Sequence, residues 1–352
     1  MFADDPIRRT AALVVLALFS LTACVTPPAP APTATRSTPD EIAPTLNPPS
    51  NLEGPGKLVI IGGGLRQSQD DIYRAFLDAR REGDLFVIPA ASAEPAKTAV
   101  RTRNGLLRHG AQPDMVWIAP LALVDDESTV DLDESAWAIN GTDALLAKQF
   151  DDACVFWFTG GDQSRITALL TLQSGNDTPV LAAIRRAHAA GAPIAGSSAG
   201  AAMMSPTMIT KGKSLPALHG PDDADGQIAF ADGLGFFPHG LIDQHFSERA
   251  RLGRLAAALA RTDTLSRGFG IDENTGLVVD ASGLMTVVGS GYVTVLQKDN
   301  AAMARSGDGW IIRDLGVSLL SAGDAFRAET GSIQPAPYKS PTIGREYSKT
   351  AL

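Results

Sequence analysis

The sequence Gly191-Ala-Pro-Ile-Ala-Gly-Ser-Ser-Ala-Gly-Ala-Ala202 is the most chemically constrained stretch of the chain. It contains the pattern G-x-S-x-G at residues 196–200, after an apolar run that predicts a strand and before small residues that can begin a helix. In such a strand–turn–helix elbow the serine hydroxyl is exposed at a sharp turn, and the glycines leave room for neighbouring backbone. Ser198 is therefore the candidate nucleophile, and the amide of Ala199 is a candidate oxyanion donor. On this stretch alone, a glycine-rich packing turn with an incidental serine is the alternative.

Short apolar runs alternate with helical segments on the N-terminal side of this elbow. The predicted strands are residues 57–62, 84–89, 115–118 and 155–159, and the predicted helices are 70–82, 98–109, 142–149, 163–172 and 179–190. This alternation predicts an α/β fold with a mainly parallel sheet, helices on both faces and sites at the carboxyl ends of the strands. After residue 280 the pattern predicts C-terminal hairpin strands at 284–288, 292–296 and 310–313, with the run 317–320 closing the domain.

The first 24 residues have the pattern of an export signal. Arg8 and Arg9 precede an apolar run too short to span a bilayer, which ends in Leu21-Thr-Ala-Cys24. This ending resembles a bacterial lipoprotein signal, in which Cys24 would carry the lipid. We predict an exported, membrane-anchored lipoprotein facing the periplasm or the cell exterior, with a plainly cleaved signal as the alternative.

The remainder of the chain divides by composition. Residues 25–53 are rich in Pro, Ala and Thr and predict a disordered tether. Residues 54–331 form the predicted folded domain, and residues 332–352 are expected to be poorly ordered. The only other cysteine, Cys154, lies in an apolar run and is interpreted as a buried hydrophobic side chain. A net charge of −9 without a clustered basic face argues against nucleic acid as a partner.

Two glycine-rich turns follow predicted strands. Gly62-Gly-Gly64 invites a dinucleotide-binding interpretation, but Gln67 stands where the third glycine of that motif belongs and no acidic residue ends the next strand. In Thr159-Gly-Gly-Asp-Gln163, the amide of Gly161 is the candidate second oxyanion donor, with Gly160 as its alternative. An ordinary turn with Asp162 as helix N-cap is compatible with that role.

A polar segment at residues 243–254 supplies the candidate base. His245 lies between a loop and a predicted helix among polar groups, which makes it the best base of the five histidines. Arg249, Arg251 and Arg254 follow it, although three arginines on a helix are more often a solvated face than a site.

Together these residues resemble the cyanophycinase group within the S51 family of serine peptidases, which also includes aspartyl dipeptidases. The resemblance rests on FTGGDQ (158–163), the elbow at Ser198, DQHF (243–246) with its arginines, and Gly270-Ile-Asp-Glu-Asn274, and covers residues 54–331. Where the family usually has threonine before the nucleophile, this chain has Ser197.

The resemblance implies a fold like that of class I glutamine amidotransferases, with three flavodoxin-like layers. It also implies a Ser198–His245–Glu273 triad, for which Asp272 is the alternative third member, since adjacent strand residues point oppositely. The implied pocket for acidic peptides is lined by Gln163, Asp243, Gln244, Arg249, Arg251 and Arg254.

The leading functional hypothesis is hydrolysis of cyanophycin, a poly-aspartate with arginines on its β-carboxyls, to β-Asp-Arg dipeptides through an acyl-enzyme on Ser198. The alternatives are an aspartyl or isoaspartyl dipeptidase for short acidic peptides and a surface binding protein without turnover. Acyl transfer of this kind requires no metal and no organic cofactor. The oligomeric state is left open by the sequence, and a homodimer is one candidate.

Overall fold

A computed structural model of the chain describes residues 54–79, 83–151, 153, 155–221 and 225–339. Cys24, Cys154 and the segments 1–24 and 25–53 lie outside the described residues, so the interpretations made of them stay predictions. Among the residues that are described, no helix is both long and apolar enough to cross a membrane.

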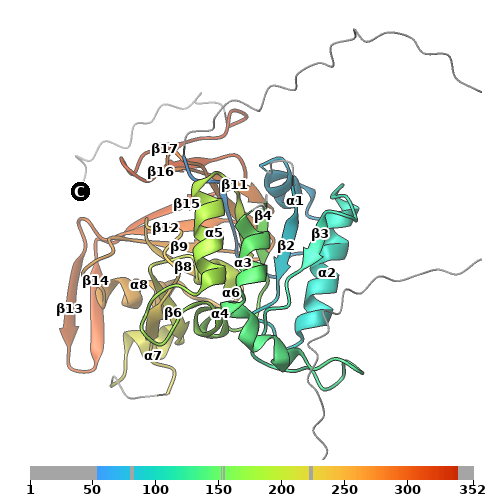
Figure 1. Cartoon of the computed structure of the whole chain (residues 1–352). Coiled ribbons are helices and arrows are strands. Elements are labelled where there is room, and N and C mark those ends of the chain that lie inside the picture. Colours follow the sequence, from blue (N-terminus) through green and yellow to red (C-terminus); the bar gives the residue numbers. More distant parts are fainter. Residues whose placement is uncertain (1–53, 80–82, 152, 154, 222–224, 340–352) are drawn as a thin grey trace, which may run out of the picture. The chain divides into compact units, whose positions relative to one another are not determined.

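The helices and strands follow one another largely as the alternating pattern predicts (Figure 1). The strands are β1 Leu58–Ile61, β2 Leu85–Ile88, β3 Val116–Ile118, β4 Val155–Phe158, β5 Ile194–Ser197, β6 Thr207–Lys211, β7 Ala229–Asp232, β8 Leu241–Gln244, β9 Arg267–Ile271, β10 Thr275–Val279, β11 Leu284–Gly289, β12 Val293–Gln297, β13 Ala302–Ser306, β14 Gly309–Arg313, β15 Gly316–Leu320, β16 Ala325–Arg327 and β17 Ile333–Gln334. The helices are α1 Asp70–Leu77, α2 Pro95–Arg108, the 3₁₀ helix η1 Glu134–Thr142, α3 Ala144–Asp151, α4 Gln163–Leu170, α5 Pro179–Ala189, α6 Ala199–Ala202, α7 Ser214–Leu218 and α8 Leu252–Ala260.

The main sheet is mixed, which corrects the prediction of a mainly parallel sheet. Its nine strands have the order β17-β16-β11-β10-β1-β5-β4-β2-β3. The pairs from β1 through β5, β4 and β2 to β3 are parallel, whereas β1 pairs antiparallel with β10, as do β10 with β11, β11 with β16 and β16 with β17. In the parallel half, β1 lies beyond β5, so this order differs from the flavodoxin-like order.

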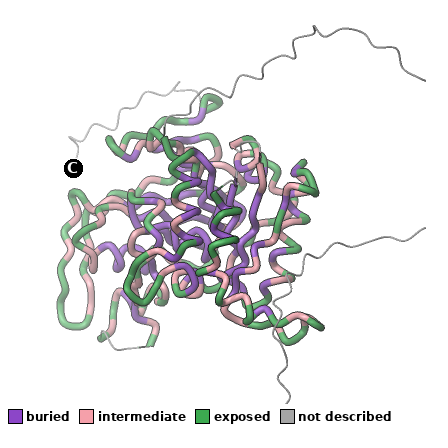
Figure 2. Tube along the Cα trace, viewed as in Figure 1, coloured by how far each residue is buried: buried purple, intermediate pink, exposed green. Residues whose placement is uncertain are grey.

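Both faces of the sheet are covered, which explains why β1 and β4 are apolar and buried at every position (Figure 2). Because side chains alternate along a strand, Val59 and Ile61 enter the core formed with α1 and α2. Leu58 and Ile60 enter the opposite core, to which α3, α4 and α5 contribute. This arrangement holds the carboxyl ends of β1, β4 and β5 rigidly side by side.

A second sheet, in the order β15-β12-β9-β8, covers the antiparallel half of the main sheet on one face. The sequence pattern predicts helices on both faces of the whole sheet. This prediction is wrong for the antiparallel half, where one face is covered by the second sheet. Strands β11 and β12 follow one another in the chain but lie in different sheets, because β12 pairs with β9 and β15 while β11 pairs with β10 and β16. The hairpins in the described C-terminal residues are β10 with β11, β13 with β14 and β16 with β17.

The folded domain continues past the predicted boundary at residue 331. Strand β17 pairs with β16, and Ala336 is 1% exposed. The carboxylate of Asp324 accepts a hydrogen bond from the Ala336 amide at 2.9 Å and forms an ion pair with Lys339. These contacts attach residues 332–339 to the domain, although Ala336 is the one buried residue among them.

Candidate active site

Ser198 lies at a strained turn between β5 and α6. Its φ is 55°, a left-handed conformation that costs a non-glycine residue on the order of 1–3 kcal/mol. Its amide donates a hydrogen bond of 2.9 Å to the carbonyl of Ile61, the last residue of β1. The elbow is therefore fixed to the end of the neighbouring strand.

The glycines on either side of Ser198 are required by close backbone approach. A Cβ atom on Gly196 would lie 2.1 Å from the carbonyl oxygen of Gly200. A Cβ atom on Gly200 would lie 2.5 Å from the carbonyl oxygen of Phe158 in β4. The G-x-S-x-G pattern thus lets the strand, the turn and the short helix pack in direct contact, as expected from the sequence.

The side chains of Ser198, His245 and Glu273 form a continuous hydrogen-bonded chain. The distance from Ser198 Oγ to His245 Nε2 is 2.7 Å, and that from His245 Nδ1 to Glu273 Oε1 is 2.6 Å. The His245 side chain is 10% exposed and that of Glu273 33% exposed. This is the arrangement of a nucleophile, a base and a group that orients the base.

Asp272, the alternative third member, faces away from His245. Asp272 is 4% exposed, and its carboxylate accepts hydrogen bonds from the backbone amides of Ser247, at 3.0 Å, and Tyr292, at 3.1 Å. It therefore ties together the segments around the site, while its neighbour Glu273 contacts the imidazole.

The surroundings of His245 keep its imidazole neutral. Burial lowers its pKa below the ordinary value; the hydrogen bond with Glu273 raises it, and the positive charges of Arg249 and Arg251 lower it again. The net direction is downward, so the base is unprotonated near neutral pH. A neutral imidazole with a free lone pair at Nε2 is the form that can accept a proton from Ser198.

The Gly62-Gly-Gly64 turn adjoins the triad. A Cβ atom on Gly63 would lie 2.3 Å from the Cε1 atom of His245, and one on Gly64 would lie 2.3 Å from the Oε2 atom of Glu273. The sequence of this turn argues against nucleotide binding and indicates no other role for it. Glycine at these positions makes room for the base and its carboxylate.

Of the candidate oxyanion donors, Gly160 lies beside the Ser198 side chain and Ala199 directly follows Ser198 in the chain. A Cβ atom on Gly160 would be 3.3 Å from Ser198 Cβ, and Gly161 has a φ of 143° that favours glycine. Within the described part of the chain, the amides of Gly160, Gly161 and Ala199 have no hydrogen-bond partner. Amides left unpaired at this position suit an oxyanion, and the assignment to Gly161 and Ala199 stays a prediction.

The predicted substrate-binding residues fall into two groups, and four of the six are buried. Arg254 is 5% exposed, and its guanidinium binds both oxygens of the fully buried Asp243, with an Nε–Oδ2 distance of 2.9 Å. Gln163 is 7% exposed and donates to the carbonyl of Ile209 at 2.6 Å; Gln244 is 8% exposed. These four residues are therefore largely shielded from solvent in this structure, and their role in substrate binding stays a prediction.

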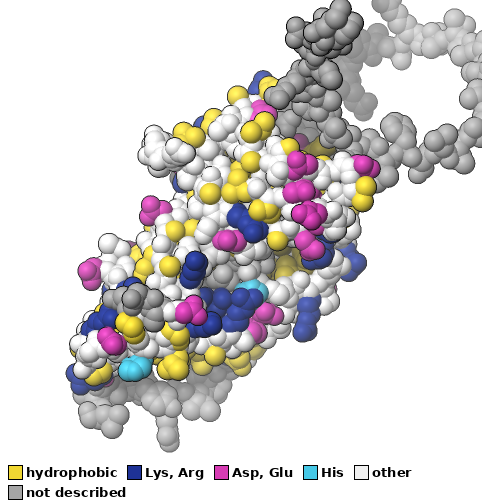
Figure 3. Space-filling model, turned by 90° about the horizontal axis from the view of Figure 1, so that it is seen from below, with side chains coloured by type: hydrophobic (Ala, Val, Ile, Leu, Met, Phe, Trp, Pro, Cys, Tyr) yellow, Lys and Arg dark blue, Asp and Glu magenta, His cyan; other side chains and the backbone are white. Residues whose placement is uncertain are grey.

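Arg251 and Arg249 lie nearer the solvent. Arg251 donates to the carbonyl of Gln244 and to Asp243, and burial lowers the pKa of its guanidinium to about 10 against the opposing effect of Asp243. Arg249 is exposed, and among the described residues its side chain has no hydrogen bond or ion pair. Figure 3 shows basic side chains gathered around a histidine beside a hollow on one face of the molecule.

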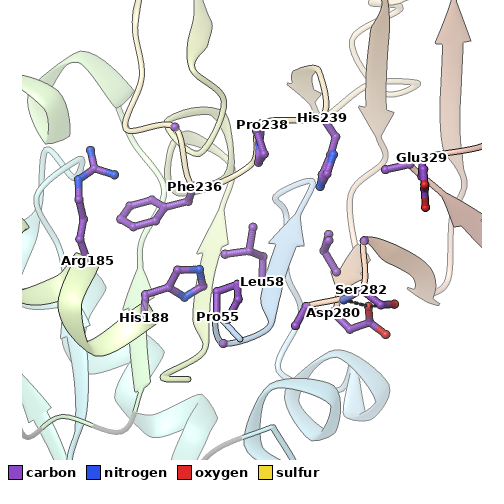
Figure 4. A pocket seen from close by; sticks show the side chains of 16 residues that line it. Pro55, Leu58, Arg185, His188, Phe236, Pro238, His239, Asp280, Ser282 and Glu329 are labelled. Atoms are coloured by element: carbon purple, nitrogen blue, oxygen red, sulfur yellow. Dashed lines mark hydrogen bonds between the residues drawn. The ribbon is translucent and has the colours of Figure 1, made fainter. Parts of the chain in front are cut away.

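A pocket of about 560 Å³ lies away from this site (Figure 4). Leu58, at the opposite end of β1 from the triad, lines it together with His188, Phe236 and His239. No member of the triad lines it. Burial of the imidazoles lowers the pKa of His188 and of His239. Among the described residues, neither imidazole has a nucleophile or a carboxylate within hydrogen-bonding distance. It is therefore not the candidate catalytic centre.

Comparisons with known proteins show the family and the fold to which this chain is similar. Residues 139–287 match the sequence profile of peptidase family S51. The chain is 36% identical over 292 residues to a cyanophycinase from Nostoc sp., covering 80% of this chain and 88% of that protein. It is 34% identical over 256 residues to a cyanophycinase from Synechococcus elongatus, covering 70% of each. The crystal structure of a peptidase from an acI-B1 Actinobacterium superposes with a TM-score of 0.51 at 19% identity, covering 78% of this chain and 98% of that one, which shows a common α/β fold.

Replacing Gly64 by alanine tests whether the glycine turn shapes the site. Gly64→Ala places a methyl group against the Glu273 carboxylate, so we expect labelling of Ser198 by a fluorophosphonate probe to slow roughly 100-fold through misplacement of the triad. Gly307→Ala is the matched control, because Gly307 has a φ of 57° against 56° for Gly64 but nothing within 4 Å of the added atom. Both variants should lose about 1–2 kcal/mol of unfolding free energy through backbone strain. Equal labelling rates in the two variants would show that the turn is not part of the site.

Proposed function

Because the chain belongs to peptidase family S51, we propose that it is a serine-type peptidase that hydrolyses cyanophycin, multi-L-arginyl-poly-L-aspartate, to β-Asp-Arg dipeptides. The observation that carries the mechanism is the 2.7 Å contact of Ser198 Oγ with His245 Nε2, whose other ring nitrogen is held by Glu273. The substrate is inferred from the cyanophycinases that the chain resembles over most of its length.

The proposed reaction is acyl transfer in two steps. Ser198 Oγ attacks the scissile carbonyl while its proton passes to His245 Nε2, and the C–N bond then breaks as His245 returns that proton to the leaving amine. A water molecule then attacks the acyl-enzyme carbonyl while its proton passes to His245. The ester bond breaks as His245 returns the proton to Ser198 Oγ, which releases the second product. Glu273 holds the imidazole in position and stabilises the imidazolium, and the amides of Gly161 and Ala199 are proposed to stabilise the oxyanion.

Arg249 is the proposed contact for a substrate carboxylate. It follows His245 by four residues, is exposed, and presents a planar guanidinium suited to bidentate binding of a carboxylate. Arg251 lies beside it but shares Asp243 with Arg254, so one buried carboxylate faces two guanidinium groups. This local excess of positive charge favours binding of a substrate carboxylate, in a protein whose net charge is −9.

Incubation of the protein with insoluble cyanophycin tests this function. We expect soluble β-Asp-Arg dipeptides, detected by mass spectrometry, from the wild type. The Ser198→Ala variant should lose roughly 10⁴-fold or more in rate while still binding the polymer. Cleavage of short isoaspartyl peptides with no release from cyanophycin would establish the dipeptidase alternative. Binding of cyanophycin without cleavage of either substrate would establish the binding-protein alternative.

A second comparison in the same assay tests the role of Arg249. Arg249→Lys keeps the positive charge but loses the planar guanidinium that can bind a carboxylate through two hydrogen bonds. If the guanidinium binds a carboxylate, kcat/KM should therefore fall roughly tenfold or more. Arg108→Lys, an exposed change at the end of α2, is the matched control. Wild-type kcat/KM in both variants would mean that Arg249 belongs to a solvated surface.

We also propose that the protein is exported and anchored through Cys24, on the basis of the sequence of its first 24 residues. The Cys24→Ser variant should be absent from the membrane fraction, or its signal segment should remain uncleaved, as measured by fractionation and intact mass. Unchanged fractionation and mass in that variant would rule out the lipoprotein assignment.

A further inference from the structure

Two residues close to Glu273 in the sequence, Asp272 and Thr275, make hydrogen bonds that hold its backbone in place. Asp272 accepts the Ser247 amide, two residues after His245. On the other side, Thr275 is fully buried, and its hydroxyl donates to the carbonyl of Glu273 at 3.1 Å. The carboxylate therefore projects from a short segment that is held at both ends.

Asn274 connects this segment to the glycine turn. Its amide donates to the carbonyl of Gly63 at 3.0 Å, and its side-chain Oδ1 accepts the amide of Arg66 at 2.9 Å. One residue thus binds both ends of the stretch 63–66. Gly64, between those ends, is the residue whose added Cβ would touch Glu273.

The backbone of Asn274 is suited to this bridge. Its φ is 54°, in the left-handed region that asparagine tolerates better than most residues, and it is 8% exposed. Its carbonyl accepts the Ser290 amide at 3.0 Å. Because the buried Asn274 Oδ1 accepts the Arg66 amide, the loop that contains Arg66 is held close to Glu273.

We propose that Asn274 is a positioning residue of the catalytic centre, which holds the glycine turn against Glu273 and so keeps the Glu273 carboxylate on Nδ1 of His245. It does not contact the Ser198 hydroxyl or the imidazole, and it acts through Glu273. This inference rests on the proposed serine-peptidase function, but the geometry that it explains does not depend on which peptide is cleaved.

Three substitutions separate the backbone conformation of Asn274 from its hydrogen bond. Asn274→Gly keeps the left-handed conformation and loses the Oδ1 acceptor. Asn274→Asp keeps both, and Asn274→Ala loses both. Asp314→Gly is the matched control, because Asp314 has a φ of 56° and is exposed.

Steady-state kinetics and pH profiles on the full-length protein test the proposal. For Asn274→Gly we expect kcat to fall roughly 10- to 100-fold with KM little changed, because a misplaced triad slows the chemical step. The acidic limb of the kcat/KM profile should move to lower pH, since loss of the Glu273 contact removes the interaction that raises the pKa of His245 while Arg249 and Arg251 still lower it. Asn274→Asp should restore most of kcat, and Asp314→Gly should match the wild type.

A role confined to folding would give a different pattern. In that case Asn274→Gly would lower the unfolding midpoint without moving the pH limb, and this result, or a wild-type kcat in Asn274→Gly, would overturn the proposal. Fluorophosphonate labelling of Ser198 and the ¹H NMR signal of the His245 Nδ1 proton are measured without substrate. These two measurements test the role of Asn274 even if the wild type does not cleave cyanophycin. Failure of the Asn274 proposal can therefore be distinguished from failure of the proposed function.

Discussion

Three consecutive backbone carbonyls at the carboxyl end of β1 hold the catalytic segments together. The carbonyl of Ile61 accepts the Ser198 amide at 2.9 Å, that of Gly62 accepts the His245 amide at 2.7 Å, and that of Gly63 accepts the Asn274 amide at 3.0 Å. Each accepted amide belongs to a different segment, and the segments are far apart in the sequence. The end of one central strand thus sets the spacing of the nucleophile, the base and the residue next to the carboxylate.

This attachment imposes strain that the rest of the fold must offset. Ser198, His245 and Asn274 all have positive φ, at 55°, 48° and 54°. Such conformations persist only where surrounding structure determines them, each at a cost on the order of 1–3 kcal/mol. The two apolar cores on either side of β1 and the buried pair of Asp243 with Arg254 supply that surrounding structure. Removing one partner of the buried pair would leave an uncompensated charge next to His245.

The sequence allows the parallel half of the fold and the serine elbow to be predicted, because both depend on local patterns. Alternating apolar runs give β1 to β5, and the glycines at 196 and 200 are needed by contacts only a few residues away or on the adjacent strand. The features that escape prediction depend on distant partners. Nothing local to Arg254 shows that Asp243 will neutralise it, and nothing local to the Gly62-Gly-Gly64 turn shows that His245 and Glu273 will pack against it. The separation of β11 from β12 into two sheets depends on β9 and β15, which lie elsewhere in the chain.

The choice between Glu273 and Asp272 is the most direct test of this catalytic arrangement. Glu273 bonds to His245 Nδ1 at 2.6 Å, while Asp272 accepts only backbone amides. The decisive measurement is kcat/KM for release of β-Asp-Arg by Glu273→Gln and Asp272→Asn, with unfolding midpoints recorded for both. Glu273→Gln should lose on the order of 10⁴-fold with its fold intact, by analogy with other triads whose carboxylate is neutralised. Asp272→Asn should lose far less, with its main effect on stability. An equal loss in both variants, or a larger loss in Asp272→Asn, would contradict the Ser198–His245–Glu273 assignment.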